Sequence, residues 1–258
     1  CAMTTAGEIF RFIDGFAPFG TAFDFDNPGL LVGGGDDSVS RTVLSLDITP
    51  DVVREAAALG AQLIVSHHPV IFHPLRDLRP ESAPYLLAKY SIAAICAHTN
   101  LDMAPGGVND CLAARLLLQN VRPLRKNAAS GLAEALCGET DRAYSPQEFA
   151  GFVRRVLGCE NVRYTDGKRA VTRAGLCSGG GADYLFDAAR ASCQAFVTGE
   201  CKHNLLLDAE NRGLTLVAAG HFETEDIVIP VLLQKLAARF PEVEFVRSQA
   251  MHNPVRYL

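Results

Sequence analysis

The stretch QLIVSHHP, residues 62–69, sets two adjacent histidines at the end of a short apolar run. A run of this length that contains Ile and Val predicts a buried strand. Because ligands of open α/β sheets gather beyond the carboxyl ends of the strands, His67 and His68 are predicted to lie at a binding site. Neighbouring side chains of a strand point to opposite sides, so two adjacent histidines suit two metal ions better than one. Pro69 supports this interpretation, because it biases His68 towards an extended backbone.

Two later apolar runs repeat this design. One ends at His98, with Asp102 four residues further along, and the other ends at His221, with Glu225 four residues further along. His221 and Glu225 stand at the start of a predicted helix, where residues four apart share a face. If the three predicted strands are neighbours, one sheet edge collects all three groups of side chains.

The residue types narrow the chemistry of this predicted site. Imidazole and carboxylate ligands favour Zn, Mn, Fe, Co or Ni over Ca. Three histidines and two carboxylates around a pair of ions are typical of two-metal hydrolases. For Glu225 taken alone, a capping role is an equally good interpretation, because acids favour helix N-termini. His73 and His252 stand outside the three groups and are interpreted as ordinary residues without a ligand role.

Strand and helix alternate along the chain, which is typical of α/β folds. In the first half we expect strands at 42–46, 62–65 and 91–97 and helices at 5–16, 50–59, 83–90 and 109–118, the last with Asn109 as its N-cap. In the second half we expect strands at 170–177, 195–198 and 214–218 and helices at 145–157, 184–192, 204–212 and 223–240. The helix at 145–157 opens with the capping-box pattern of Ser145 and Glu148 around Pro146.

The middle of the chain, residues 119–141, holds turn residues and charges and is interpreted as a connector. It is too short to separate independent domains. The sequence therefore predicts one α/β domain over 1–258, made of two lobes at about 1–125 and 126–258.

Composition is that of a soluble globular protein with a substantial core. Of the 258 residues, 48% are hydrophobic and 21% are charged, with a formal net charge of -5. No long basic run points to a nucleic-acid partner, and no apolar run approaches the ~20 residues that span a membrane. No signal peptide is visible and the eight cysteines form no C-x-x-C pair, so we expect reduced thiols and a cytoplasmic location.

A glycine-rich stretch, SGGG at 178–181, precedes the predicted helix at 184–192. The backbone N–H groups of Gly179, Gly180 and Gly181 could hold a phosphate group of a substrate. The stretch lacks the Gly-Lys-Ser/Thr ending of a P-loop, so this is the weakest of the predicted binding sites.

The three histidine segments also resemble a known family. SHHPVIF at 66–72, AHTNLD at 97–102 and GHFETE at 220–225 resemble, in this order, the hallmark segments of the Nif-three-like family, also labelled GTP cyclohydrolase 1 type 2. Further matches are DNPGLLVG at 26–33, GGVND at 106–110, and TGE at 198–200 with His203. The resemblance covers nearly the whole chain, and a departure is Phe25, where many relatives have Trp.

The resemblance implies a dinuclear metal site and assigns roles to single residues. Its ligands would be His67, His68, Asp102, His221 and Glu225, with Glu225 bridging the two ions. His98 matches a family position beside the metals, which implies a supporting or proton-transfer role, and His203 is a similar candidate. The resemblance also implies two interwoven α/β lobes with mixed sheets and a ring-like homohexamer. The short stretch at 119–141 leaves no room for the extra domain that some relatives insert there.

The leading functional hypothesis is a metal-dependent hydrolase that acts on a nucleotide or a related small molecule. Opening of the guanine ring of GTP is implied by the family label alone. The alternative is a metal-binding regulatory or scaffold protein that forms a ring without catalytic turnover.

Overall fold

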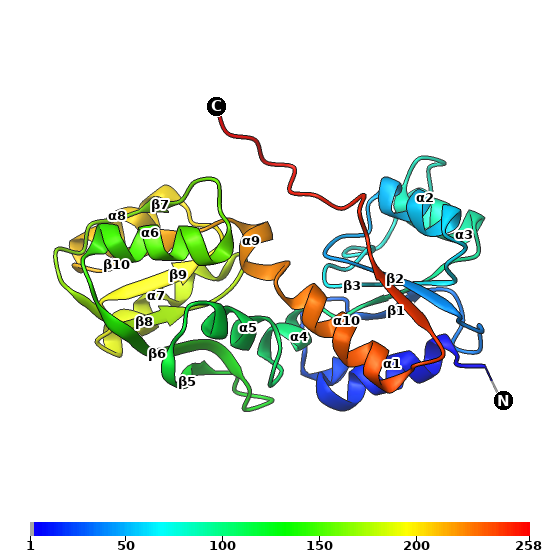
Figure 1. Ribbon diagram of the computed structural model, residues 1–258, viewed down its shortest axis with the longest axis horizontal. Helices are drawn as coiled ribbons and strands as arrows, with labels where there is room; N and C mark the ends of the chain where they lie inside the picture. Colours follow the sequence, from blue (N-terminus) through cyan, green and yellow to red (C-terminus); the bar gives the residue numbers. More distant parts are fainter. Residues whose placement is uncertain (1–2) are drawn as a thin grey trace. The chain divides into compact units, whose positions relative to one another are not determined.

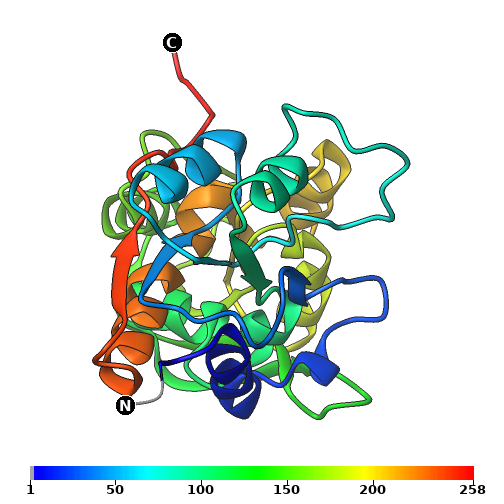
Figure 2. The same cartoon turned by 90° about the vertical axis from the view of Figure 1, so that its right-hand side faces the viewer.

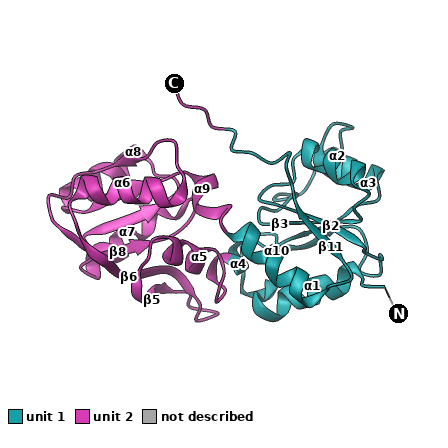
Figure 3. Cartoon of the chain, viewed as in Figure 1, with its two compact units in different colours: residues 1–101, 228–254 teal, residues 102–227, 255–258 magenta. Residues whose placement is uncertain are grey.

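The computed structural model describes residues 3–258 and divides the chain into two compact units (Figure 3). Unit 1 comprises residues 1–101 and 228–254, and unit 2 comprises residues 102–227 and 255–258. The division does not follow the continuous boundary near residue 125 expected from the sequence. The chain returns to unit 1 with helix α10 (Val228–Arg239) and strand β11 (Glu244–Arg247), and β11 pairs in parallel with β2 (Arg41–Ser45).

Within the described residues, unit 1 is built on a five-stranded mixed sheet in the order β1-β4-β3-β2-β11. Its remaining strands are β1 (Gly29–Val32), β3 (Leu63–Ser66) and β4 (Ala93–Cys96). Strands β4, β3, β2 and β11 run parallel, and β1 runs antiparallel to β4. The carboxyl ends of the parallel strands therefore meet at one edge, where such sheets bind ligands.

Helices cover both faces of the unit 1 sheet (Figure 1). Helices α2 (Pro50–Ala58) and α3 (Ala83–Lys89) cover one face, and α1 (Ala6–Phe16) and α10 cover the other. The core under α2 and α3 is formed by buried residues of helices and strands, among them Val43, Val52, Val53, Ile64, Leu87 and Ala94. Figure 2 shows unit 1 from the side, with the loop at residues 69–82 standing out from its body.

Unit 2 has, in the same described part of the chain, a six-stranded mixed sheet in the order β5-β6-β8-β9-β10-β7. Its strands are β5 (Gln119–Lys126), β6 (Ala133–Tyr144), β7 (Arg163–Tyr164), β8 (Val171–Leu176), β9 (Ala195–Thr198) and β10 (Thr215–Ala218). Strands β8, β9 and β10 run parallel, and the other pairings are antiparallel.

Two helical layers also enclose this second sheet. Helices α5 (Val108–Arg115) and α6 (Pro146–Leu157) pack on one face, around the buried Leu112 and Phe149. On the other face, around Phe196, pack the 3-10 turn η2 (Gly181–Tyr184) and helices α7 (Leu185–Arg190) and α8 (His203–Asn211). The sequence-based expectation of a mixed α/β fold, with two mixed sheets flanked by helices, is confirmed.

The capping box expected at the start of the helix at 145–157 is confirmed. Ser145 accepts a hydrogen bond from the backbone N–H of Glu148, and the Glu148 carboxylate accepts one from the backbone N–H of Ser145. Thr5 and Glu8 form the same reciprocal pair at α1. Each pair satisfies backbone donors that a helix start leaves without a partner inside the helix.

The connector expected at 119–141 is wrong, because these residues form the antiparallel pair β5 and β6 at the edge of the unit 2 sheet. Strand β5 is exposed along nearly all of its length, so its sequence lacks the alternation of a half-buried strand. Arg122, Pro123 and Arg125 lie within it. Proline and exposed charge are typical of edge strands, and because of them hydrophobic periodicity does not indicate a strand here.

The N-cap role expected for Asn109 is also wrong. Gly107 is the N-cap of α5, and it caps the helix without a side chain. Asn109 is buried, where its Oδ1 accepts from the backbone N–H of Ser178 at 3.0 Å and its Nδ2 donates to the Glu134 carbonyl at 3.2 Å. Its side chain therefore ties α5 to the glycine-rich segment at 178–181.

The single helix expected over 223–240 is two helices, α9 (His221–Glu225) and α10. Pro230 is the third residue of α10 and has no N–H to donate to the carbonyl of Asp226, four residues earlier. The proline ring would also clash with that carbonyl in a continuous helix. Because of this break, α9 is a separate short helix, and it carries His221 and Glu225.

The described cysteines agree with the expectation of reduced thiols. No disulfide joins the seven that the structure describes, and most of them are buried. Across residues 3–258, every helix is too short or too polar to cross a lipid bilayer.

Candidate metal centre

Unit 1 gathers three histidines at the carboxyl edge of its parallel strands. His67 and His68 follow β3, and His98 follows β4, the strand next to it in the sheet. One ring nitrogen of each of the three lies within 4.8 Å of the others, so the group could hold a metal ion. The ring centroids stand 5.0 Å apart for His67 and His68 and 5.1 Å apart for His67 and His98.

Each of these imidazoles is oriented through its Nδ1 atom by an oxygen acceptor. His67 Nδ1 lies 2.8 Å from the carbonyl of Ala97, His68 Nδ1 lies 2.7 Å from Asp47 Oδ1, and His98 Nδ1 lies 2.7 Å from Asp26 Oδ1. An acceptor at Nδ1 requires the proton there, which leaves the ring lone pair on Nε2. Carboxylate and carbonyl partners orient metal-binding histidines in this way, so the group fits a transition-metal ion.

Asp26 is held more tightly than an ordinary carboxylate. Besides His98 it accepts from the backbone N–H of Thr99 at 3.0 Å and from the Thr99 hydroxyl at 2.5 Å, and its side chain has no exposed surface. Burial raises its pKa, but the hydrogen bonds from His98 and Thr99, with the attraction of His98, outweigh burial and lower the pKa to about 2. Asp26 is therefore a fixed anion behind His98.

The roles of Asp26 and Asp47 towards the histidines were not predicted from the sequence. Asp47 lies two residues beyond β2, as its partner His68 lies two residues beyond β3, so its position just past the end of a strand is the available signal. Asp26 begins the family-type segment at 26–33, but its partner His98 lies 72 residues further along the chain, so no local pattern indicates the pair.

Unit 2 brings together its own acidic and imidazole groups. His221 opens α9 just beyond β10, and its Nε2 lies 3.0 Å from Glu225 Oε2. Its Nδ1 lies 3.4 Å from Glu200 Oε1, a carboxylate that follows β9. Glu225 is only 3% exposed, so it is a buried carboxylate rather than a solvated capping residue. Burial of a carboxylate is costly unless a cation or several donors compensate it.

The negative charges of Asp102 and Glu225 both affect the pKa of the same buried thiol of unit 2, that of Cys177. Burial raises the pKa of Cys177 well above its ordinary value, and the negative charges of Asp102 and Glu225 raise it further. Two carboxylates near one buried position repel each other. A divalent cation would remove that repulsion, so the donor set of unit 2 also fits a metal.

Gly179 has a steric role in this arrangement that the sequence did not reveal. Its φ of +53° favours glycine, and a Cβ there would overlap Glu225 Oε1 and lie 3.0 Å from His221 Nε2. Its N–H is donated to the Thr224 hydroxyl at 3.1 Å, and the N–H of Gly181 is donated to the Ser178 carbonyl. Binding of a phosphate by the glycine segment stays a prediction, and two of its N–H groups already have protein acceptors.

A family comparison adds to this geometry. The model of the Duf34/NIF3 (NGG1p interacting factor 3) family matches residues 4–254. The chain belongs to this family. The resemblance expected from its three histidine segments is therefore confirmed.

Relatives and solved structures agree with membership of the NIF3 family. A Clostridium perfringens protein named GTP cyclohydrolase 1 type 2 homolog is 28% identical over 262 residues, which cover 97% of this chain and 98% of that protein. A Streptomyces coelicolor protein with the same name is 32% identical over 234 residues, which cover 86% and 82%. A crystal structure of a Staphylococcus aureus hypothetical protein matches with a TM-score of 0.92 at 25% identity, over the full length of both chains.

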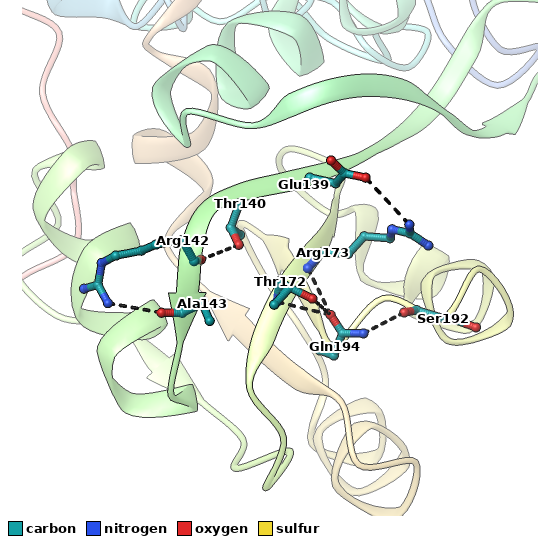
Figure 4. Close-up of a pocket in the computed structure, with 8 residues that line it drawn as sticks. All are labelled: Glu139, Thr140, Arg142, Ala143, Thr172, Arg173, Ser192 and Gln194. Atoms are coloured by element: carbon teal, nitrogen blue, oxygen red, sulfur yellow. Dashed lines mark hydrogen bonds and ion pairs between the residues drawn. The ribbon is translucent and has the colours of Figure 1, made fainter.

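Three further histidines considered in the sequence analysis do not belong to the clusters of this NIF3 chain that could hold a metal ion. His203 is exposed at the start of α8, and His73 and His252 are exposed in loops. None of the three belongs to a metal-type group of the residues that the structure describes. A hollow of about 550 Å³ in unit 2 is lined by residues such as Glu139 and Arg173 and contains none of the predicted ligands (Figure 4).

Proposed function

We propose that this NIF3-family protein is a metal-dependent hydrolase that acts on a nucleotide or a related small molecule such as GTP. It holds two divalent transition-metal ions through His67, His68, Asp102, His221 and Glu225. The observation that carries the proposal is that His67 and His68 each direct Nδ1 to an oxygen acceptor, which leaves the Nε2 lone pair of both rings for a metal ion. The names of the relatives support the reaction class.

The covalent chain supports the proposal that both units contribute ligands. The chain passes from unit 1 to unit 2 between Leu101 and Asp102, and it returns between Ile227 and Val228. Asp102 is therefore the first residue after one crossing, only four residues beyond His98. Glu225 stands two residues before the other crossing. In the proposed site Glu225 would be a ligand shared by the two ions.

Within this proposal each protein group has a defined task. Bound ions would act as Lewis acids on the substrate and would favour ionisation of a water molecule. Asp47 and the Ala97 carbonyl hold His68 and His67 in the tautomer that ligation needs. His98, oriented by Asp26, takes a proton from the attacking water and returns it to the leaving group, a role that imidazole performs near neutral pH.

The metal claim and the turnover claim are tested separately. Elemental analysis of protein purified without added metal should find about two transition ions per chain. Chelator-stripped and reconstituted samples of the same preparation are then compared against nucleotides and phosphoesters. Turnover in the reconstituted sample alone supports the enzyme. Bound metal without turnover on any of these substrates would favour the scaffold alternative, and failure to bind metal after reconstitution refutes both.

Self-association is a second part of the proposal, supported by the family resemblance. We propose a ring-like homohexamer, so light scattering should report a mass several times the 27.7 kDa of one chain. A mass near that of a single chain at micromolar concentration would contradict it.

A further inference from the structure

The glycine-rich segment at 178–181 is held in unit 2 by hydrogen bonds of its own backbone. The backbone N–H of Gly179 donates to the Thr224 hydroxyl at 3.1 Å. The Gly179 carbonyl accepts from the backbone N–H of Glu200 at 2.9 Å and from the Thr198 hydroxyl at 3.2 Å. Both polar backbone groups of Gly179 therefore have partners in the protein, which fixes this part of the segment as a wall.

Thr224 joins this wall to α9, the short helix that carries His221 and Glu225. Its side chain is fully buried. Besides accepting from Gly179, its hydroxyl donates to the carbonyl of Gly220 at 2.9 Å and lies 3.0 Å from that of His221. A hydroxyl has one proton and two lone pairs, so it can bind on both sides at once. One buried side chain thus connects the glycine segment to the first turn of α9.

The wall lies directly against the two predicted ligands of α9. A Cβ on Gly179 would overlap Glu225 Oε1 and would lie 3.0 Å from His221 Nε2. The next residue, Gly180, has open space in the same direction, since no heavy atom of the described residues lies within 4 Å of its Cβ position. The close contact therefore belongs to Gly179 alone of these two glycines, and it limits where the Glu225 carboxylate can lie.

We propose that Thr224 is a positioning residue of the metal centre, and that it acts by holding Gly179 against the pair formed by His221 and Glu225. A metal ligand needs neighbours that fix its orientation, and the loss of such a neighbour costs about 10–100-fold in metal affinity. The inference rests on the proposed function for the metal. It assigns the glycine segment to the support of ligands rather than to the binding of a phosphate group.

Threonine variants test the hydroxyl. Thr224→Val keeps the volume of the side chain and removes the hydroxyl, so calorimetric titration of chelator-stripped protein with Zn²⁺ should show about 10–100-fold weaker binding. Thr224→Ser keeps the hydroxyl and should restore most of the affinity. Thr215→Val is the matched control, because Thr215 is also buried and its hydroxyl accepts the backbone N–H of Gly167 at 3.2 Å. Thr215 lies at the start of β10, the opposite end from His221, so this variant should lose stability but keep its Zn²⁺ affinity.

Glycine variants test the wall itself. In Gly179→Ala the new methyl group meets the Glu225 carboxylate, so Zn²⁺ binding should fall by more than about 100-fold. Gly180→Ala is the matched control and should bind Zn²⁺ like the wild type, because its methyl group enters open space. Inorganic phosphate is titrated into the same proteins. No phosphate binding that depends on Gly180 is expected.

Each outcome decides the inference. Wild-type Zn²⁺ affinity in Thr224→Val, an equal loss of affinity in Thr215→Val, or phosphate binding that Gly180→Ala abolishes overturns it. A second readout needs no metal: the imidazole NMR signals of His221 in stripped protein should shift in Thr224→Val and Gly179→Ala and stay in place in both controls. If the wild type binds no metal, the proposed function fails, and the His221 signals still decide whether Thr224 positions the pair.

Discussion

Glu225→Ala is expected to weaken metal binding by more than about 100-fold, because losing even an outer partner of a metal ligand costs 10–100-fold. Glu225 is 3% exposed, contacts His221 Nε2 at 3.0 Å and shares the surroundings of Cys177 with Asp102. Without metal, the substitution removes one of two repelling carboxylates, so the stripped variant should be no less stable than the stripped wild type.

The readout is therefore the stabilisation gained on adding metal, measured by thermal or urea unfolding. At a metal concentration of 100 times Kd the wild type should gain about 2.7 kcal/mol, and the variant should gain little. His68→Ala should behave in the same way, and turnover should be undetectable in both variants. Glu223→Ala is the matched control. Glu223 lies in the same short helix, but its negative charge raises the pKa of Cys159 rather than that of Cys177. Equal stabilisation of Glu225→Ala and the wild type would contradict the ligand role of Glu225.

The sequence predicts most of the inner strands of the two sheets and misses the strands at their edges. Buried parallel strands read as short apolar runs that end abruptly in polar residues, which is why β3, β4, β9 and β10 were found. The strands at the sheet edges, β1, β5, β7 and β11, are not predicted, and neither is β6, the long partner of β5. They are partly or fully exposed, so hydrophobic periodicity gives little sign of them.

The division of the chain into two units could not be predicted, because it depends on pairing between strands that are far apart in the sequence. Nothing local in Glu244–Arg247 shows that it joins Arg41–Ser45, about 200 residues earlier, as the outer strand of the same sheet. The boundary near residue 125 depends on the interpretation of residues 119–141 as a connector, which the β5–β6 pair contradicts. The units instead depend on which strands share a sheet, and that is decided by tertiary contacts.

The candidate site shows the same contrast between local and distant information. Strand ends marked His67, His68, His98 and His221, because a ligand residue directly after an apolar run is a local signal. The acceptors that orient these histidines come from other strand ends, as Asp47 does, or from a loop, as Asp26 does. Such pairs depend on strand order, which the sequence does not contain in any local form.

Asp26→Asn is expected to destabilise the folded protein by about 2 kcal/mol near neutral pH, since hydrogen bonds to a charged group contribute about 1.5–3 kcal/mol. The Asp26 carboxylate accepts from His98 Nδ1 and from the N–H and hydroxyl of Thr99. An amide in its place turns a donor towards one of these donors. Asp24→Asn is the matched control, because Asp24 is an exposed acid two residues away and should leave the free energy of unfolding unchanged.

The loss in Asp26→Asn should also depend on pH in a defined direction. The pKa of Asp26 falls from 3.8 to about 2 on folding, so between these values the unfolded chain binds a proton that the folded chain does not. Wild-type stability from this group is therefore complete above about pH 4 and declines as the pH falls towards 2. The variant has no carboxyl at this position, so the difference in unfolding free energy between the two proteins should shrink over that interval. The imidazole NMR signals of His98 should shift in the variant while those of the exposed His252 stay in place. A stability difference that is constant from pH 5 to pH 3, with unmoved His98 signals, would show that Asp26 does not act as a charged partner of His98.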